Sequence, residues 1–398
     1  MQVTSTIFTS KNLLKAYLDC RKTKRKTVNA IKFEVDLENK LADLQNRLTA
    51  RNYYPGRSIC FVVSKPKPRE IFAAEFSDRV IHHLLINQIE PIWEKRGFIE
   101  DTYACRRGKG NHFGVKQVAV LAKKFWWYGQ FDIGNFFASI NKPILFEIFK
   151  KKILEQTRPA WWQEEILYLA KIIIFNNPTR NYFYKGDPNL KKLVPPGKSL
   201  FDQNDETGMP IGNLTSQFLA NVYLSELDHY VKDDLGCVGY ARYVDDFLIF
   251  SNSKEEIIAW RNKIRLFLLE RLKLKLHPRK QQIQICRHGI PFVGYFIKPW
   301  GVTTRRNVVK KLKNKIYYFN QNWRDLNLER IVASLNSYYG HLGKSASFNL
   351  RKHLTERHIS NDLQYFLKPK DNKFFCLKLT NFNLPTANHF SDFNQPPV

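Results

Sequence analysis

The spacing of apolar and polar residues along the chain predicts a succession of helices and strands. Residues 10–52 carry apolar positions at helical spacing. Residues 59–73 (ICFVVSKPKPREIFA) predict a hairpin whose bend contains two prolines. A longer helix is predicted over residues 76–96, because its apolar side chains keep helical spacing: Val80, Leu84, Leu85, Ile89 and Ile92.

The middle of the chain continues this alternation and contains one long polar segment. Residues 176–210 are rich in Pro, Gly and Asn, and their length is typical of a functional loop or insertion. The other segments are predicted as a strand at 125–133, helices from about 143 to 175, a helix at 214–234, a strand–turn–strand unit at 237–251, a helix at 254–272 and a strand pair around 281–298. This order predicts an α+β domain, an antiparallel sheet backed by helices.

After Gly301 the chain becomes markedly basic. The segment VVKKLKNKIYYF predicts a helix with one apolar stripe, formed by Val309, Leu312, Ile316 and Phe319. Its lysines lie largely off that stripe: Lys310, Lys311, Lys313 and Lys315. Such a face either is simply solvated or contacts phosphates. The last 25 or so residues, rich in Asn, Phe and Pro, are predicted to form an irregular tail.

The overall composition points to a polyanionic partner. The formal charge is +28, from 64 Lys and Arg against 36 Asp and Glu, which favours nucleic acid over a merely basic surface. An anionic membrane surface is the other polyanion, but no apolar run approaches the ~18–20 residues of a membrane span. The N-terminal segment has no apolar signal core, and six scattered cysteines form no CxxC pair. We therefore expect a cytoplasmic protein with reduced thiols.

Two adjacent aspartates occupy an unusual place in the sequence CVGYARYVDDFLIFS, residues 237–251. Asp245 and Asp246 lie at the turn of a predicted hairpin between apolar and aromatic runs. A single turn aspartate is ordinary, but two carboxylates with apolar flanks repel each other and are costly to bury. A divalent cation would turn that repulsion into affinity. Asp233 and Asp234, at a polar helix end, need no such explanation.

A third carboxylate is available at the end of another predicted strand, Asp132 in FDIGNFF. Three aspartates suit Mg²⁺, which binds through a few carboxylates and substrate phosphates. Two such ions ~3.5–4 Å apart stabilise the attacking and leaving oxygens of a phosphoryl displacement. Charge and carboxylates together predict phosphoryl or nucleotidyl transfer on nucleic acid, and a nuclease would use the same chemistry.

Several motifs together resemble the reverse transcriptases. YVDD at 243–246 follows DIGNFF at 132–137, with Lys65 and Arg69 in a basic hairpin before them. GMPIGNLTSQFLANVYLSELD at 208–228, Lys280 after LKLKLHP, and PFVGY at 291–295 complete the order. The resemblance covers about residues 55–300. It implies a right-hand polymerase fold with fingers, an antiparallel-sheet palm and a helical thumb. The ordered fingers and primer-grip motifs disfavour the alternative of a two-metal nuclease.

The resemblance also implies domain boundaries. We expect an N-terminal helical extension at 1–54, fingers at 55–125, a palm at 126–300, a basic helical thumb at 301–367 and an irregular tail at 368–398. Within the palm, 176–210 is the loop insertion and 211–234 the motif helix.

Finer features are similar to the reverse transcriptases of diversity-generating retroelements. These are KPKPREIFAAEFSDR, DTYACRRGKGNH, PPGKSLF, IGNLTSQ and SLNSYYGHLGKS. Ile211 stands where most prokaryotic relatives carry Gln, and Ser216-Gln217 stands where they carry Ser-Pro, a signature associated with error-prone copying of template adenines. An antiviral-defence reverse transcriptase making a specific DNA product, and a catalytically idle RNA-binding scaffold, are the alternatives; the intact aspartates argue against the scaffold.

The resemblance assigns roles at the reaction centre. It implies two Mg²⁺ ions, with Mn²⁺ as a substitute, held by Asp132, Asp245, Asp246 and the backbone carbonyl of Ile133. Lys280 is a candidate general acid for pyrophosphate departure, or a surface charge. The residues expected to bind the incoming dNTP are Lys65 (or Lys67 in its place), Arg69, Phe137, Gly212 and Gln217. Phe137 resembles the steric gate against a ribose 2′-OH, with Phe136 turned inward by strand alternation, and Ile211 is expected to loosen base-pair checking.

Other residues are expected to contact nucleic acid. Tyr243, Phe292, Gly294 and Tyr295 resemble a primer grip, and the residues expected to hold the nucleic-acid backbone are Arg106, Arg107, Lys109, Lys310, Lys311 and Lys313. The partners implied are a template RNA, its cDNA, dNTPs, a structured non-coding RNA and a basic accessory protein or oligomeric partner, without a membrane.

Overall fold

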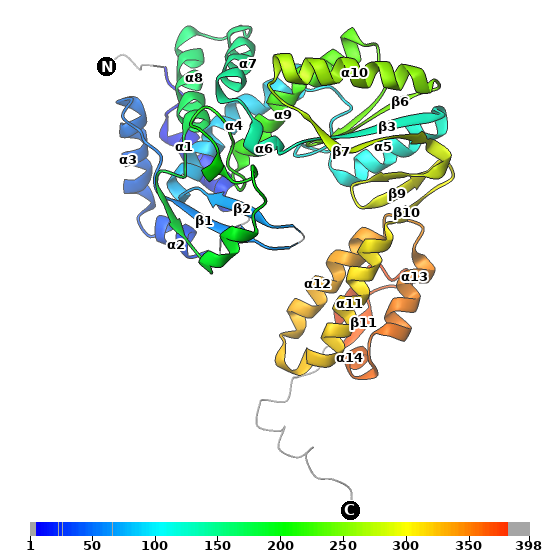
Figure 1. The fold of residues 1–398 in the computed structure, drawn as a ribbon. Coiled ribbons are helices and arrows are strands. Elements are labelled where there is room, and N and C mark those ends of the chain that lie inside the picture. The colour runs from blue at the N-terminus through cyan, green and yellow to red at the C-terminus, as the bar shows by residue number, and fades with distance from the viewer. Residues whose placement is uncertain (1–4, 23, 26, 66, 381–398) are drawn as a thin grey trace, which may run out of the picture. The chain divides into compact units, whose positions relative to one another are not determined.

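The computed structural model describes residues 5–22, 24–25, 27–65 and 67–380 of the chain. Its contacts divide the chain into two compact units. The first comprises Met1–Gly114 and Phe125–Ile285, and the second comprises Val115–Lys124 and Cys286–Val398. Figure 1 shows their helices and strands. Among the described residues, no helix combines the length and the apolar character needed to cross a bilayer.

The first unit begins with the helices predicted over residues 10–52. These are α1 (Ser10–Arg21), α2 (Val28–Glu34) and α3 (Leu37–Thr49); α1 and α2 each pack on α3 and on α4 (Phe76–Arg96). The segment before α1 is held by Glu165, a buried residue of α8 (Ala160–Phe175). Its carboxylate accepts hydrogen bonds from Thr6 Oγ1 (2.6 Å) and from the Ile7 amide (2.7 Å). Residues 23 and 26, within the basic stretch at 21–26, lie outside the described residues.

A small sheet follows, built on the predicted hairpin. Strands β1 (Ser58–Val63) and β2 (Arg69–Ala73) pair antiparallel, as predicted. The sheet has a third strand, β4 (Tyr182–Tyr184), which pairs parallel with β1. The predicted loop at 176–210 is therefore partly ordered as an edge strand, and it also contains the 3₁₀ helices η1 (Pro188–Leu193) and η2 (Leu200–Asp202).

The larger sheet of the first unit is antiparallel, in the order β5-β6-β3-β7. Its strands are β5 (Gly239–Tyr243), β6 (Asp246–Ser251), β3 (Trp127–Ile133) and β7 (Leu276–Ile285). Helix α10 (Lys254–Arg271) packs on β3, β6 and β7 (Figure 1). The other helices that build the core of this unit are α7 (Lys142–Leu154), α8 and α9 (Leu214–His229), with a π-helical turn η3 at Tyr230–Asp234. The expected α+β arrangement of antiparallel sheet and helices is confirmed.

The second unit combines a small sheet with a helical bundle. The sheet, in the order β10-β9-β8, consists of β8 (Ile290–Phe292), β9 (Tyr295–Lys298) and β10 (Gly301–Thr304). The strand pair predicted around 281–298 is confirmed in β8 and β9, which pair antiparallel, whereas residues 281–285 at the start of that range belong to β7 and pair with β3 of the larger sheet. The bundle contains α11 (Arg306–Asn322), η5 (Trp323–Asp325), α12 (Leu328–Leu342), α13 (Phe348–His353), η6 (Leu354–His358) and α14 (Asn361–Phe366).

The amphipathic helix predicted after Gly301 is α11. Leu312, Ile316 and Phe319 of its apolar stripe are buried in the bundle core, with Val309 packed against it. The lysines off that stripe are exposed: Lys310, Lys311, Lys313 and Lys315.

Two features of the second unit differ from the predicted organisation. The tail expected to be irregular from residue 368 begins with a hairpin of β11 (Leu367–Pro369) and β12 (Leu377–Leu379), because Leu367 and Leu377 join the core of the bundle. Residues 381–398 of that tail lie outside the described residues. Helix α5 (Asn111–Lys124) was not predicted, and its Val115–Lys124 segment belongs to this unit.

Candidate active site

The two adjacent aspartates lie at the predicted turn between β5 and β6. Val244, which precedes them, has a φ of 59°, a left-handed conformation that is strained for a β-branched side chain. Arg242 holds this turn by donating from Nη1 to the Val244 carbonyl oxygen (2.9 Å). The Arg242 guanidinium is itself buried and forms a two-pronged ion pair with Asp228 of α9, at 2.6 and 2.7 Å. The motif helix therefore anchors the aspartate turn.

Asp132 lies beside this turn on the neighbouring strand. In the antiparallel register of β3 and β6, Asp132 is the direct partner of Asp246. The Ile133 amide donates to the carbonyl oxygen of Asp245 (3.2 Å). A register irregularity between Phe131 and Ile133 interrupts the pairing with β7 at the same place. The three predicted carboxylates thus come together from two adjacent strands.

Burial and the charges of neighbouring carboxylates raise the pKa of both Asp245 and Asp246. Burial raises the pKa of Asp246 to about 7, and the charges of Asp132 and Asp245 act in the same direction, against a hydrogen bond from Gln130 Nε2 (3.0 Å). The pKa of Asp245 is also raised, by burial first and by Asp132 second. Carboxylates that repel one another in a partly dry site are suited to a divalent cation, which stabilises their charged forms.

Lys280 of β7 occupies part of this acidic centre. Its Nζ lies 2.6 Å from Asp132 Oδ2. Over the described part of the chain, no group of three or more Asp, Glu, His or Cys side chains is arranged to coordinate a metal ion. The donor types fit Mg²⁺, since all are hard oxygen ligands, while Asp132 is engaged by the Lys280 ammonium.

The acidic centre opens into a cavity of about 610 Å³. Of the predicted nucleotide-binding and fidelity residues, this cavity is lined by Arg69, Phe137, Ile211, Gly212 and Gln217. Tyr243, assigned to the primer grip, lines it too. Among the described residues, its wall contains Lys67 rather than Lys65, which favours the alternative assignment within the hairpin.

Gly212 joins the motif helix to the small sheet at a point where no side chain fits. Its φ is +126°, and a Cβ would lie 2.8 Å from Ile71 Cγ2 and 3.0 Å from the Phe72 carbonyl oxygen. The Phe72 amide donates to the carbonyl oxygen of Ile211 (2.9 Å). The glycine therefore allows backbone to approach backbone, with Ile211 held at the cavity wall.

Phe136 and Phe137 differ in burial as expected, for a different reason. Phe136 is buried and Phe137 is half-buried at the cavity. They lie on a short helix, α6 (Phe136–Ser139), so the alternation of a strand does not separate them. The helix starts after Asn135, whose φ of 50° turns the chain away from β3.

The basic residues expected to hold the template divide into two groups. The prediction for Arg106 is wrong: its side chain is only 1% exposed and binds Glu94 (2.8 Å) and the Thr102 hydroxyl, so it is a structural ion pair. Lys109 is 10% exposed and paired with Glu100 (2.9 Å). Arg107 forms an ion pair with Glu90 (2.5 Å) and is the most exposed of the three, at 74%.

The remaining primer-grip residues belong to the second unit. Phe292 and Tyr295 are buried, and Gly294 between them has a φ of +91°. Tyr295 stacks on His341 of α12 at 4.2 Å between ring centres, and its hydroxyl donates to the His341 carbonyl oxygen (2.9 Å). A Cβ on Gly294 would lie 2.9 Å from His341 Cε1. The turn is thus fixed to the helical bundle.

Comparison with known proteins identifies the family. Residues 63–297 match the model of the reverse transcriptase (RNA-dependent DNA polymerase) family. The chain belongs to the reverse transcriptase family. It is therefore an RNA-directed DNA polymerase with the fingers, palm and thumb of that fold, and the aspartate cavity lies within the matched region.

Individual relatives of this reverse transcriptase are distant. It is 22% identical to protein YkfC of Escherichia coli (strain K12) over 67% of the chain and 74% of YkfC. It is 20% identical to nuclear intron maturase 1, mitochondrial, of Arabidopsis thaliana, over 59% of the chain and 42% of the maturase. Among solved structures, telomerase from Candida albicans in complex with a fragment of telomeric RNA matches with a TM-score of 0.45 and 11% identity, over 75% of this chain and 57% of that chain.

Sequence reasoning missed some residues of the cavity. Gln130, which donates to Asp246, lies two positions before Asp132 on the same face of β3, and that spacing could have indicated it. Glu70 and Lys198 also line the cavity. Both lie in stretches that carry the family resemblance, KPKPREIFAAEFSDR and PPGKSLF, but their place at the cavity depends on tertiary contacts between β2 and the insertion.

Proposed function

We propose that this reverse transcriptase copies a template RNA into cDNA by two-ion nucleotidyl transfer, in the error-prone manner of a diversity-generating retroelement. The observation that carries the proposal is the convergence of Asp132, Asp245 and Asp246 on the cavity lined by Ile211. The template RNA, dNTPs, a structured non-coding RNA and a basic accessory protein are its proposed partners.

The side chains of the cavity would take different roles in one nucleotide addition: metal binding, triphosphate binding and proton donation. Asp132, Asp245, Asp246 and the Ile133 carbonyl would hold Mg²⁺, which supplies charge stabilisation to the attacking 3′ oxygen and the leaving pyrophosphate. Arg69 and Lys67 bind the triphosphate as charge-assisted donors. Lys280, whose Nζ lies 2.6 Å from Asp132 Oδ2, would donate a proton to the departing pyrophosphate.

Selectivity rests on two apolar side chains. The half-buried ring of Phe137 would exclude a ribose 2′-OH and so select deoxynucleotides. Ile211 offers no hydrogen bond at the cavity wall, where an amide would check the geometry of the nascent base pair. Base selection then depends more on pairing alone, which raises misincorporation.

The proposed domains follow the family pattern. Residues 55–125 act as fingers and 126–300 as palm, while 301–367 form the basic thumb. The exposed lysines of α11, Lys310, Lys311 and Lys313, would contact the nucleic-acid backbone.

Primer extension on an RNA template tests the proposal. The full chain is supplied with dNTPs and Mg²⁺, and wild type is compared with Asp245→Ala/Asp246→Ala and with Ile211→Gln, followed by sequencing of the products. Template-copied DNA that disappears in the double mutant supports the polymerase. Errors clustered opposite adenine that decrease in Ile211→Gln support the retroelement assignment.

Other outcomes would redirect the assignment. Faithful or repetitive DNA would favour a defence enzyme that makes a specific product. An unchanged error rate in Ile211→Gln would remove the fidelity role of that residue. No DNA from wild type, even with co-purified RNA and partner supplied, would leave an RNA-binding scaffold.

A further inference from the structure

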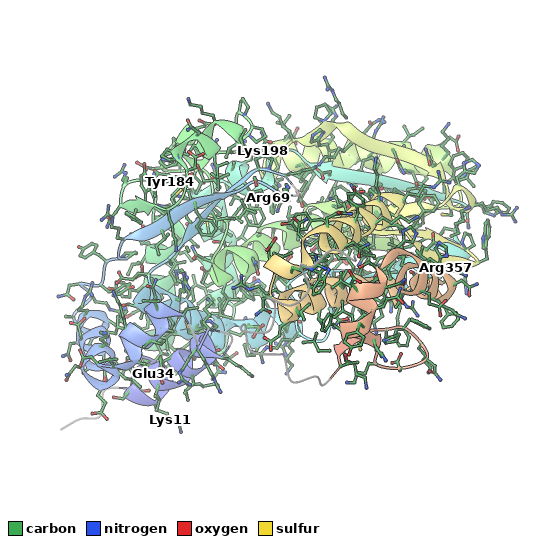
Figure 2. The ribbon with its side chains drawn as sticks, turned by 90° about the horizontal axis from the view of Figure 1, so that it is seen from below. Lys11, Glu34, Arg69, Tyr184, Lys198 and Arg357 are labelled. Carbon is green, nitrogen blue, oxygen red and sulfur yellow. The ribbon has the colours of Figure 1, made fainter. Side chains whose placement is uncertain are left out.

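A lysine of the long insertion lines the catalytic cavity. Lys198 belongs to the polar segment 176–210 and lies in the wall of the same cavity as Arg69 and the three aspartates. Figure 2 labels both cations, which lie close together in that view. Lys198 is exposed, and within the described residues its ammonium makes no hydrogen bond or ion pair. The cavity therefore contains a cation that the roles given so far leave unused.

The backbone that carries Lys198 is a tight turn. The Lys198 amide donates to the Pro195 carbonyl oxygen (3.1 Å), and Gly197 has a φ of +72°, as the third position of a type II turn requires. The Gly197 amide donates to Asp202 Oδ2 (3.1 Å). A Cβ on Gly197 would lie 3.1 Å from Asn135 Nδ2, so the turn closely approaches the residue that opens α6.

A buried carboxylate ties this turn to the fingers strand β2. Glu70 is 6% exposed and accepts hydrogen bonds from the Leu200 amide (2.9 Å) and Ser199 Oγ (3.1 Å). Phe201 packs on Phe72 of the same strand, with 5.7 Å between ring centres. Glu70 directly follows Arg69, so one strand positions Arg69 and anchors the turn that carries Lys198.

The charges of the cavity indicate what Lys198 could bind. Its cationic side chains are Lys67, Arg69, Lys198 and Lys280, and Lys280 is already paired with Asp132. A nucleoside triphosphate carries more negative charge than two cations neutralise, so a third cation on a fixed turn adds a contact at little entropic cost. A solvated surface lysine would not need the buried Glu70 tether.

We propose that Lys198 is a further nucleotide-positioning residue that binds the β- and γ-phosphates of the incoming dNTP together with Arg69. It would hold the pyrophosphate product by the same contact. The insertion thereby becomes part of the nucleotide site. This inference rests on the proposed polymerase function.

Steady-state primer extension separates this role from the alternatives. Lys198→Ala and Lys198→Arg are compared with wild type on poly(rA)/oligo(dT) with dTTP and Mg²⁺. Lys192→Ala is the matched control, because Lys192 is exposed in the same insertion and does not line the cavity. We expect the KM for dTTP to rise about tenfold in Lys198→Ala, the size of one charge-assisted contact, with a smaller change in kcat. Inhibition by pyrophosphate should weaken in parallel, and Lys198→Arg should recover most of the affinity.

The binding of nucleic acid provides the discriminating readout. The Kd of Lys198→Ala for the template–primer, and its dependence on salt, should equal those of wild type. An unchanged KM for dTTP would overturn the proposal. So would a weaker template–primer Kd with a salt slope lower by about one, which indicates a contact to the nucleic-acid backbone.

Failure of the polymerase function itself would be recognised separately. Calorimetric titration of Mg·dTTP into the protein bound to a chain-terminated template–primer needs no turnover. If wild type binds dTTP in this assay and Lys198→Ala binds it as tightly, the role of Lys198 is excluded whether or not DNA is made. If wild type neither binds dTTP nor makes DNA, the proposed function falls, and this inference falls with it.

Discussion

Arg242 donates a hydrogen bond of 2.9 Å to the carbonyl oxygen of Val244, the strained residue that leads into the aspartate pair. The same guanidinium is bound to Asp228 in the core of the first unit. Because both charges are fully buried, the interaction links the stability of the palm to the geometry of the aspartate turn. Arg242, which directly precedes the YVDD motif, thus stabilises the backbone conformation of that motif.

Removal of the Arg242 guanidinium should lower the free energy of unfolding of the palm. Arg242→Met leaves Asp228 buried without its partner, which costs about 3–5 kcal/mol in the free energy of unfolding. Urea unfolding measures the loss. Arg265→Met is the control, because Arg265 is exposed on α10; its effect should stay within ~0.5 kcal/mol. Equal stability of the two variants would contradict the role of Arg242.

The stability of the metal-free protein should depend on Asp246. Its pKa is about 7 in the folded chain and 3.8 ordinarily, so the folded state binds the extra proton and loses stability as pH rises between these values. Asp246→Asn removes this loss. In EDTA, the Tm of Asp246→Asn minus that of wild type should therefore grow from about pH 5 to about pH 8.

Mg²⁺ supplies the second part of that measurement. At about pH 8 the ion should raise the Tm of wild type more than that of Asp246→Asn, because it stabilises the ionised carboxylates. Asp234→Asn, at an exposed position, should show neither effect. A Tm difference that is flat with pH would mean that Asp246 titrates normally.

Substitution of Arg106 should affect stability, whereas substitution of Arg107 should affect nucleic-acid binding. Arg106→Ala removes a buried partner of Glu94 and should lower the free energy of unfolding by about 2–3 kcal/mol, while the salt dependence of template–primer binding stays the same. Arg107→Ala should leave stability within ~0.5 kcal/mol and reduce the salt slope by about one. Chemical unfolding and fluorescence anisotropy at several salt concentrations measure the two effects. The reverse pattern would restore Arg106 as a phosphate contact.

Gly212→Ala should weaken both the fold and the nucleotide site. The added Cβ meets the backbone of Phe72 at a positive φ, so we expect a loss of about 1–3 kcal/mol and a higher KM for dNTP. Gly301→Ala is the matched control, since among the described residues no heavy atom other than those of Gly301 and its two chain neighbours lies within 4 Å of its Cβ position. A Gly212→Ala protein with wild-type stability would show that the strand β2 can shift to make room.

The sequence predicted the local elements well and the long-range pairings poorly. Helix α4 was predicted from its periodicity with the bounds that the structure has, and the hairpin of β1 and β2 from its prolines. Strand β4 escaped because three residues in a polar loop become a strand only by pairing with β1, far away in the sequence. The partner of β7 is likewise set by tertiary contacts, which no local pattern reveals.

In the candidate site, too, the sequence indicated what depends on local pattern and missed what depends on tertiary contacts. Asp245 and Asp246 at a predicted turn, and Asp132 at the end of a predicted strand, were singled out from the sequence, and the sheet register brings them together. Charge alone could not distinguish Arg106 from Arg107, since only the position of Glu94 decides which of the neighbours is buried. Phe136 and Phe137 were separated correctly for a wrong reason, because a helical turn and a strand both place neighbours on different sides.

The assignment of Val115–Lys124 to the second unit has a consequence for synthesis of the chain. Val115 and Val118 are buried, yet the rest of their unit begins only at Cys286. At ribosomal rates of about 5–20 residues per second, this segment waits on the order of 10 s for its partners. During that interval Val115 and Val118 lack the part of their unit that is still to be synthesised.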